Sequence, residues 1–293
     1  YFRQAIKSST WKNPNPYDCE PYYNLGLSLK KQGKINTAFD AFYKAVWDGN
    51  MQDKAFYQLA CIASGRGDYN DALEYIEKSL VKGMHNLKAR TLKSALLRKL
   101  GKNTEATEFA KETRNIDALD HSAYYELYKI TGNGLDEMQA VMRGDNHNYI
   151  ELALSYMSAY LTDDAIEILK LAPNDNEPMV HYYLYALTND KSELDGGNYA
   201  AYYLGCLFYD RGRWEESKEL WEKCADNIKL PTVYRNLSLT YYNKLKDGVL
   251  AVKAMEKAFS IDKSDARIFF ELDQLYKTLN FSLEKRLANM NEN

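Results

Sequence analysis

Apolar residues in this chain recur at the spacing of helices that bury one face. Between residues 22 and 29 they stand at positions i, i+3, i+4 and i+7, at Tyr22, Leu25, Gly26 and Leu29. A second stripe at helical spacing follows at Ala38, Phe42 and Ala45. Gly33, between the stripes, suits the left-handed conformation that ends a helix. The pattern predicts two helices joined by a tight turn.

This pair of helices repeats at a fixed period. Glycines recur in steps of 34 residues at Gly33, Gly67 and Gly101. Alanines keep the same step and phase at Ala38, Ala72 and Ala106. One helix pair cannot bury its own apolar face, so neighbouring pairs must stack. Gly26 and Gly205 are expected where the two helices of a pair touch, because glycine allows a close approach.

The spacing resembles the tetratricopeptide repeat (TPR), a helix-turn-helix unit of about 34 residues. The same template recurs from Tyr149, Ala201 and Tyr234. The resemblance implies an all-α fold, a right-handed α-α superhelix of about seven units. We expect residues 1–18 to be the remnant of a preceding repeat and residues 19–120 to form three regular repeats. Residues 121–197 then hold irregular repeats, and residues 198–293 hold two repeats and an unfinished one.

Two stretches break the pattern. Gly132 and Gly134 interrupt a first helix that begins near Tyr124, and the segment that follows, up to Gly144, is too short for a regular partner helix. Between residues 179 and 197 only one helix fits, and a second helix is missing. This predicts either a halved repeat or residues absent from the sequence near 188–197.

Several strings point to a narrower group. They are residues 13–18, 20–26, 96–101, 201–205 and 271–276, and they are similar to the TPR region of large bacterial multidomain proteins. In that group the N-terminal domain has no known function and is linked to carbohydrate. The resemblance implies a scaffold that works with other domains of the same polypeptide, and it brings no catalytic motif.

Composition and charge exclude several classes of protein. The net charge of -3 comes from interspersed charges of both signs, which disfavours nucleic acid as a partner. No apolar run reaches the roughly 20 residues of a membrane span. The 4 cysteines include no CxxC pair, so we expect buried thiols, no metal site and no cofactor. The compartment stays open, with the cytoplasm slightly favoured, because an export signal could precede Tyr1.

Enzyme chemistry has no support in the motifs. The histidines are scattered at His85, His121, His147 and His181. No nucleophile elbow, phosphate-binding glycine loop or dinucleotide fingerprint is present. The acidic pairs at 163–164 and 215–216 stand where second helices begin, and we interpret them as solvated helix starts that favour the helix dipole. The chain is therefore not expected to be an enzyme.

The candidate binding site is a concave groove lined by the first helices. Tyrosine outnumbers phenylalanine by 25 to 10, and the repeat phase places tyrosines and basic residues on that face, at Tyr23, Tyr57, Lys88, Arg98, Tyr125, Tyr199, Tyr202, Tyr209, Arg235 and Tyr242. Such a surface suits an extended peptide with acidic groups, or another domain of the parent protein. The alternatives are that the tyrosines only cover helix surfaces between repeats, or that they stack on sugar rings.

Two more specific interpretations concern basic residues. Chaperone-binding TPR domains share a clamp of Lys, Asn and Arg side chains that binds a C-terminal carboxylate. The positions of this chain that match the clamp are Tyr23, Leu27, Gln58, Lys88 and Leu92. Only Lys88 agrees, so no such clamp is expected. The one basic cluster is Lys88, Arg90, Lys93, Arg98, Lys99 and Lys102. We interpret it as a solvated helix face, with docking of an acidic segment as the alternative.

Overall fold

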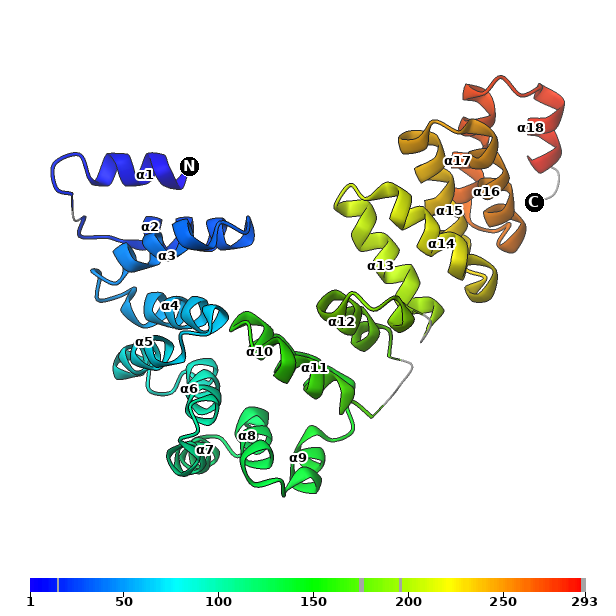
Figure 1. Ribbon diagram of the computed structural model, residues 1–293. Helices are drawn as coiled ribbons and strands as arrows, with labels where there is room; N and C mark the ends of the chain where they lie inside the picture. Colours follow the sequence, from blue (N-terminus) through cyan, green and yellow to red (C-terminus); the bar gives the residue numbers. More distant parts are fainter. Residues whose placement is uncertain (15, 174–176, 195–196, 291–293) are drawn as a thin grey trace. The chain divides into compact units, whose positions relative to one another are not determined.

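The structure is a computed structural model that describes residues 1–14, 16–173, 177–194 and 197–290 (Figure 1). Throughout these residues every regular element is helical, as the sequence predicts. The suspected gap near 188–197 includes residues 195 and 196, which lie outside the described residues. The chain divides into two compact units, unit 1 at 1–173 and unit 2 at 174–293.

Unit 1 is built from helices that pack in consecutive pairs. From α2 onward, each even-numbered helix is the first of a pair and the next helix is its partner. The helices are α1 (Phe2–Ser9), α2 (Glu20–Lys31), α3 (Ile35–Ala45), α4 (Gln52–Arg66), α5 (Tyr69–Lys82), α6 (Leu87–Lys99), α7 (Asn103–Ile116), α8 (His121–Thr131), α9 (Leu135–Met142), α10 (Asn146–Ser158) and α11 (Thr162–Lys170).

Unit 2 continues the pairing, with α13, α15 and α17 as first helices. A single helix, α12, precedes them and is followed only by a short 3-10 turn, which agrees with the one helix expected there. The elements are α12 (Pro178–Thr188), η1 (Lys191–Leu194), α13 (Asn198–Asp210), α14 (Trp214–Ile228), α15 (Pro231–Thr240), the π-helix η2 (Tyr241–Leu245), α16 (Gly248–Ile261), α17 (Ala266–Thr278) and α18 (Leu283–Met290).

The turns inside the first three pairs are set by glycine. Gly33, Gly67 and Gly101 have φ values of 73°, 82° and 73°, which lie in the left-handed region. Glycine enters this region at no steric cost, whereas other residues pay roughly 1–2 kcal/mol. The predicted left-handed helix ends are therefore confirmed.

The two helices of a pair approach closely where the sequence places small residues. Ala38, Ala72 and Ala106 are fully buried. A Cβ atom built on Gly26 would lie 2.6 Å from the ring of Phe42. One built on Gly205 would lie 2.5 Å from the indole of Trp221. The repeat phase read from the sequence is therefore confirmed by the packing.

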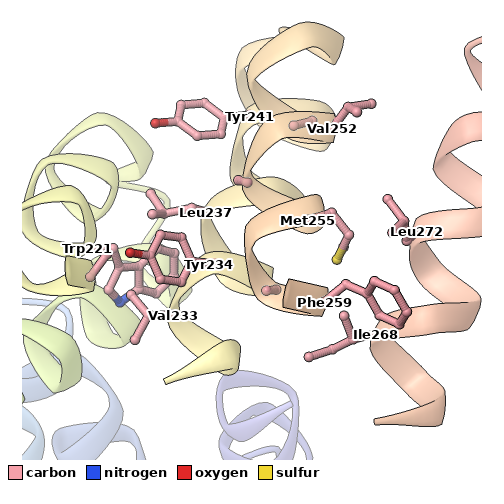
Figure 2. Packing of buried hydrophobic residues seen from close by; sticks show 14 of the residues in the cluster. Trp221, Val233, Tyr234, Leu237, Tyr241, Val252, Met255, Phe259, Ile268 and Leu272 are labelled. Atoms are coloured by element: carbon pink, nitrogen blue, oxygen red, sulfur yellow. The ribbon is translucent and has the colours of Figure 1, made fainter. Parts of the chain in front are cut away.

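The core of unit 2 lies between first and second helices. Figure 2 shows Trp221 from α14 and Leu237 from α15 on one side of this core, and Met255 and Phe259 from α16 facing Leu272 from α17. All five are at least 95% buried. Burying side chains of this size contributes roughly 1.5–3 kcal/mol each, which holds α14 to α17 together.

The pair α8 and α9 is irregular. Gly132 ends α8 in the left-handed conformation, and Gly134, also left-handed, precedes α9. Helix α9 has only 8 residues and ends at the left-handed Arg143. In the next pair, α10 packs on α6 as well as on α8, the first helix before it.

Two interpretations of charged residues as solvated were wrong in part. Arg90 is 3% exposed, and its guanidinium donates to Thr113 Oγ1 at 2.9 Å and to Glu112 at 3.0 Å. Asp164 is likewise 3% exposed, whereas its neighbour Asp163 is exposed. Both buried charges are tolerated because hydrogen-bonded partners of opposite charge surround them.

Candidate functional site

In unit 2 the first helices carry two neighbouring hollows. One, of about 330 Å³, is lined from α13, α14, α15 and α17, and it includes Tyr209, Arg235 and Arg267. The other, of about 230 Å³, is lined mainly from α15 and α17, and it includes Tyr242 and Phe270. Leu239 lines both hollows. We call the two together the first-helix groove.

An ion pair joins the two hollows. Arg235 donates to both carboxylate oxygens of Glu271 at 2.6 Å each, and Arg267 donates to the same carboxylate at 3.1 Å. Burial pushes the pKa of Glu271 up, but the hydrogen bonds from Arg235 and Arg267 outweigh burial and hold that pKa below its ordinary value. The two-pronged geometry fixes Arg235 on the border between the hollows.

Aromatic rings supply most of the remaining surface. The ring of Tyr209 packs against Trp221, with 5.9 Å between the ring centroids. Lys244 Nζ lies 5.7 Å from the centroid of the Tyr209 ring. Phe270 is 61% exposed and lines the second hollow beside the half-buried Tyr242. Exposed aromatic area of this kind is what partner proteins bury at their strongest contacts.

Local structure positions these side chains. Asp265 caps α17 by accepting hydrogen bonds from the backbone amides of Arg267 and Ile268, and this fixes the helix turn that presents Glu271. At the other side, α15 widens into the π-helix η2. Tyr241 and Tyr242 open this π-helix and line different hollows. π-Turns are frequent at functional positions because they redirect side chains.

Cys206 on α13 lines the first hollow of the groove, and Tyr202 stands beside it, one turn earlier on the same helix. Burial is the main cause that raises the pKa of Tyr202 to about 12, and burial also raises the pKa of the Cys206 thiol. Both side chains therefore stay protonated and uncharged at neutral pH. They contribute apolar surface and hydrogen-bonding tips rather than charge.

The first helices of unit 1 are contacted by the chain itself. Lys30 on α2 donates to Gln58 Oε1 at 3.0 Å and to the carbonyl of Ser158 at 3.3 Å, at the end of α10. The Tyr57 hydroxyl lies 3.2 Å from Ser158 Oγ. Lys30 also lies 5.2 Å from the ring of Tyr160. A segment of the same chain thus occupies the face of unit 1 that corresponds to the first-helix groove.

Further along this face a buried charge network ties four helices together. Arg98 on α6 donates to Glu126 on α8 at 2.7 Å and to Asp164 on α11 at 2.7 Å. Tyr156 on α10 donates to Glu126 at 2.6 Å, and Tyr125 donates to Asp164 at 3.3 Å. Glu126 and Tyr125 are fully buried. These groups are engaged with one another and leave little surface for a partner.

The ten residues expected in one groove therefore fall into different environments. Tyr209, Arg235 and Tyr242 line the first-helix groove, Tyr202 lies beside it, and Tyr199 is exposed near the start of α13. In unit 1, Tyr23 packs on Phe42, Tyr57 contacts Ser158, and Lys88 is exposed. Arg98 and Tyr125 belong to the buried network.

Sequence reasoning missed the acidic partners of this surface. Glu271 pairs with Arg235 from the preceding first helix, and Glu126 pairs with Arg98 in the same way. The signal was present, since each glutamate stands on a predicted first helix, 36 or 28 residues after its arginine. Searching for opposite charges about one repeat apart on adjacent first helices would have found both pairs.

The tetratricopeptide repeat pattern matches residues 20–46, 53–80 and 199–227. The chain is a tetratricopeptide repeat protein. The matched segments coincide with the pairs α2–α3, α4–α5 and α13–α14. The TPR pattern thus spans both units, and the first-helix groove begins in the last of these matched pairs.

Several solved TPR structures are similar to this chain. YrrB, described as a TPR protein with an unusual peptide-binding site, shares 14% identity over 92% of this chain and 96% of its own, with a TM-score of 0.38. The Cut9–Hcn1 hetero-tetramer of APC/C shares 15% identity over 94% of this chain and 53% of its own, with a TM-score of 0.35. MamA shares 18% identity over 74% and 96%, with a TM-score of 0.26. Assignment to the TPR family follows from the repeat matches.

Of the helices in the described ranges, none combines the length and apolar character needed to cross a membrane. Among the same residues, no three side chains of the types that bind metal gather in one place.

Proposed function

We propose that this TPR protein is a non-catalytic scaffold that holds an extended peptide segment in the first-helix groove of unit 2. The segment belongs to a partner protein or to another domain of the same polypeptide. The observation that carries the proposal is the continuity of the groove: its two hollows meet at Leu239 and run across three successive first helices. An extended segment binds through contacts spread along its length, and this groove offers them from one repeat to the next.

The chemistry of the groove supports a peptide. Tyr209, Tyr242 and Phe270 offer rigid apolar area, and two of them end in hydroxyls that hydrogen-bond a backbone. Arg235 and Arg267 bring two positive charges to the single carboxylate of Glu271. One positive charge therefore remains unbalanced and attracts an acidic group of a peptide. Unit 1 adds a precedent, because its equivalent face already contacts a polypeptide segment, the end of α10.

The test is selection from a library of unstructured peptides, followed by titration calorimetry with the selected sequences. We expect the triple variant Tyr209→Ala, Tyr242→Ala and Phe270→Ala to lose at least about tenfold in affinity, since aromatic contacts dominate such interfaces. The matched control is Tyr203→Ala, a half-exposed tyrosine that lines neither hollow.

The possible outcomes distinguish a peptide site, a sugar site and a groove that binds neither. Equal binding by the wild type and the folded triple variant would contradict the proposal. An oligosaccharide panel is titrated in parallel, because the excess of tyrosine over phenylalanine, 25 to 10, also suits stacking on sugar rings. A sugar that binds the wild type but not the triple variant, with no peptide selected, would replace the peptide by a carbohydrate ligand.

A further inference from the structure

Unit 2 has another hollow, larger than the two of the first-helix groove, on a different face of α15. It encloses about 610 Å³ between the second helices α14 and α16, and residues of α15 form its base. Its apolar floor consists of Ala225, Leu237 and Ala254, each at least 92% buried, and the rings of Tyr234 and Tyr241. We call it the outer hollow. It shares no lining residue with the first-helix groove.

Charged side chains form two rows along the rims of the outer hollow. Glu222 and Asp226 stand one helical turn apart on α14, and Lys253 and Lys257 stand one turn apart on α16. All four residues are exposed. An acidic row on α14 therefore faces the two lysines of α16 across an apolar floor. Glu256 of α16 also lines the hollow, but its carboxylate is engaged by Lys285 and by the hydroxyl of Tyr276.

Tyrosine hydroxyls hold the acidic row in place, whereas the two lysines of the basic row are available to a binding partner. The hydroxyl of Tyr234 donates to Asp226 at 2.6 Å, and that of Tyr241 donates to Glu222. Burial is the main cause that raises the pKa of Tyr234 to about 12, so this hydroxyl remains a donor at neutral pH. In the described part of the chain, no carboxylate forms an ion pair with Lys253 or Lys257.

The spacing of the rows selects the conformation of an occupant. Residues four apart on a helix are about 6 Å apart along its axis, which matches side chains at i and i+4 of another helix. An extended strand repeats its side chains on one face about every 6.7 Å, which is a poorer match to the spacing of the rows. The rows therefore favour a helical occupant over an extended one.

We propose that the outer hollow binds an amphipathic helix of a partner protein. Its apolar stripe lies on the floor of Ala225, Leu237 and Ala254, its acidic flank lies along Lys253 and Lys257, and its basic flank lies along Glu222 and Asp226. The opposite charges of the two rims fix the direction of the helix, because turning it end to end brings like charges together. This site does not depend on the first-helix groove.

The experiment uses three synthetic helical peptides with the same leucine stripe. One carries glutamates on one flank and lysines on the other, the second carries lysines on both flanks, and the third carries glutamates on both. Fluorescence anisotropy with the full chain should show the mixed peptide binding roughly five- to tenfold more tightly than either of the others, as expected for two or more partly exposed ion pairs.

The decisive variant reverses the basic row. Lys253→Glu with Lys257→Glu makes both rims acidic, so the preference should switch from the mixed peptide to the peptide with lysines on both flanks. The control is Lys246→Glu with Lys277→Glu, which changes the net charge equally at exposed positions that do not line the outer hollow. Circular dichroism confirms that both variants are folded.

Three results would overturn the proposal. The first is that no peptide binds, and the second is that the order of affinities is the same in the wild type and in the reversed variant. The third is that sedimentation shows self-association of the wild type that the reversed variant loses. That result would assign the outer hollow to a second copy of this chain.

Discussion

At the residue scale, the absence of a side chain sets the distance between paired helices. Gly26 faces the ring of Phe42, which is fully buried, and a Cβ atom at position 26 would overlap that ring. We expect Gly26→Ala to lower the free energy of unfolding by about 1–3 kcal/mol through overpacking. Gly49→Ala is the control, since nothing lies within 4 Å of its added Cβ atom. Chemical denaturation compares the two, and equal stability of both variants would show that the contact at Gly26 is not tight.

A second prediction at this scale concerns Asp164. Burial pushes its pKa up, but Arg98 and Lys99 outweigh burial and hold the pKa below its ordinary value. A lowered folded-state pKa means that Asp164 stabilises the fold above about pH 4, and that this contribution is lost as the pH falls through the folded-state pKa. We expect Asp164→Asn to cost about 3 kcal/mol at neutral pH, because it removes a buried carboxylate from the partly buried cations of Arg98 and Lys99.

The pH dependence separates this effect from a packing defect. The stability difference between the wild type and Asp164→Asn should shrink as the pH falls, since protonated Asp164 resembles asparagine. Asp163→Asn, one residue earlier and exposed, should change little at any pH. Urea denaturation at several pH values measures both, and a difference that stays constant into acid would contradict the role of the charge.

At the scale of elements, α17 depends on its cap. Asp265 accepts from two backbone amides in the first turn, which carries Arg267 of the first-helix groove, and Glu271 stands one turn further along α17. We expect Asp265→Ala to destabilise by about 1 kcal/mol and to speed amide exchange in the first turn of α17. Asp265→Asn should behave like the wild type, because asparagine caps helices equally well. Fast exchange in both variants would show that the charge rather than the cap matters.

The elements also show what a sequence can predict. Local rules were sufficient for the helix pairs, because Gly33 and Gly101 end their helices through their own backbone freedom. Helical spacing likewise located the buried faces of α2 and α3. Spacing does not say which distant segment covers a face, and so the contact of Tyr57 with Ser158 was not foreseen. Arg98 was expected to line an open groove, but it pairs with carboxylates that lie 28 and 66 residues away.

At the scale of the whole molecule, the internal contacts make unit 1 different from a simple array. In a simple solenoid each repeat contacts only its neighbours, and distant repeats are independent. Here Lys30 and Tyr57 contact the end of α10. We expect truncation after residue 145, which removes α10, α11 and all of unit 2, to speed amide exchange in α2 and α4. Truncation after residue 173, which removes unit 2 alone, should leave this exchange unchanged. Removal of residues 1–18 is a further control. Unchanged amide exchange in α4 after the truncation at residue 145 would show that unit 1 behaves as a simple array.

The return of α10 to α2 and α4 also sets the order of events during synthesis. Lys30 and Tyr57 are made 128 and 101 residues before the serine they contact. On the ribosome, the early helix pairs therefore fold while their inner face still lacks its cover, and Lys30 and Tyr57 stay exposed to other proteins for that interval. Contacts so distant along the chain also slow folding, because a long loop must close before they form. A chaperone that protects nascent chains would meet this face first.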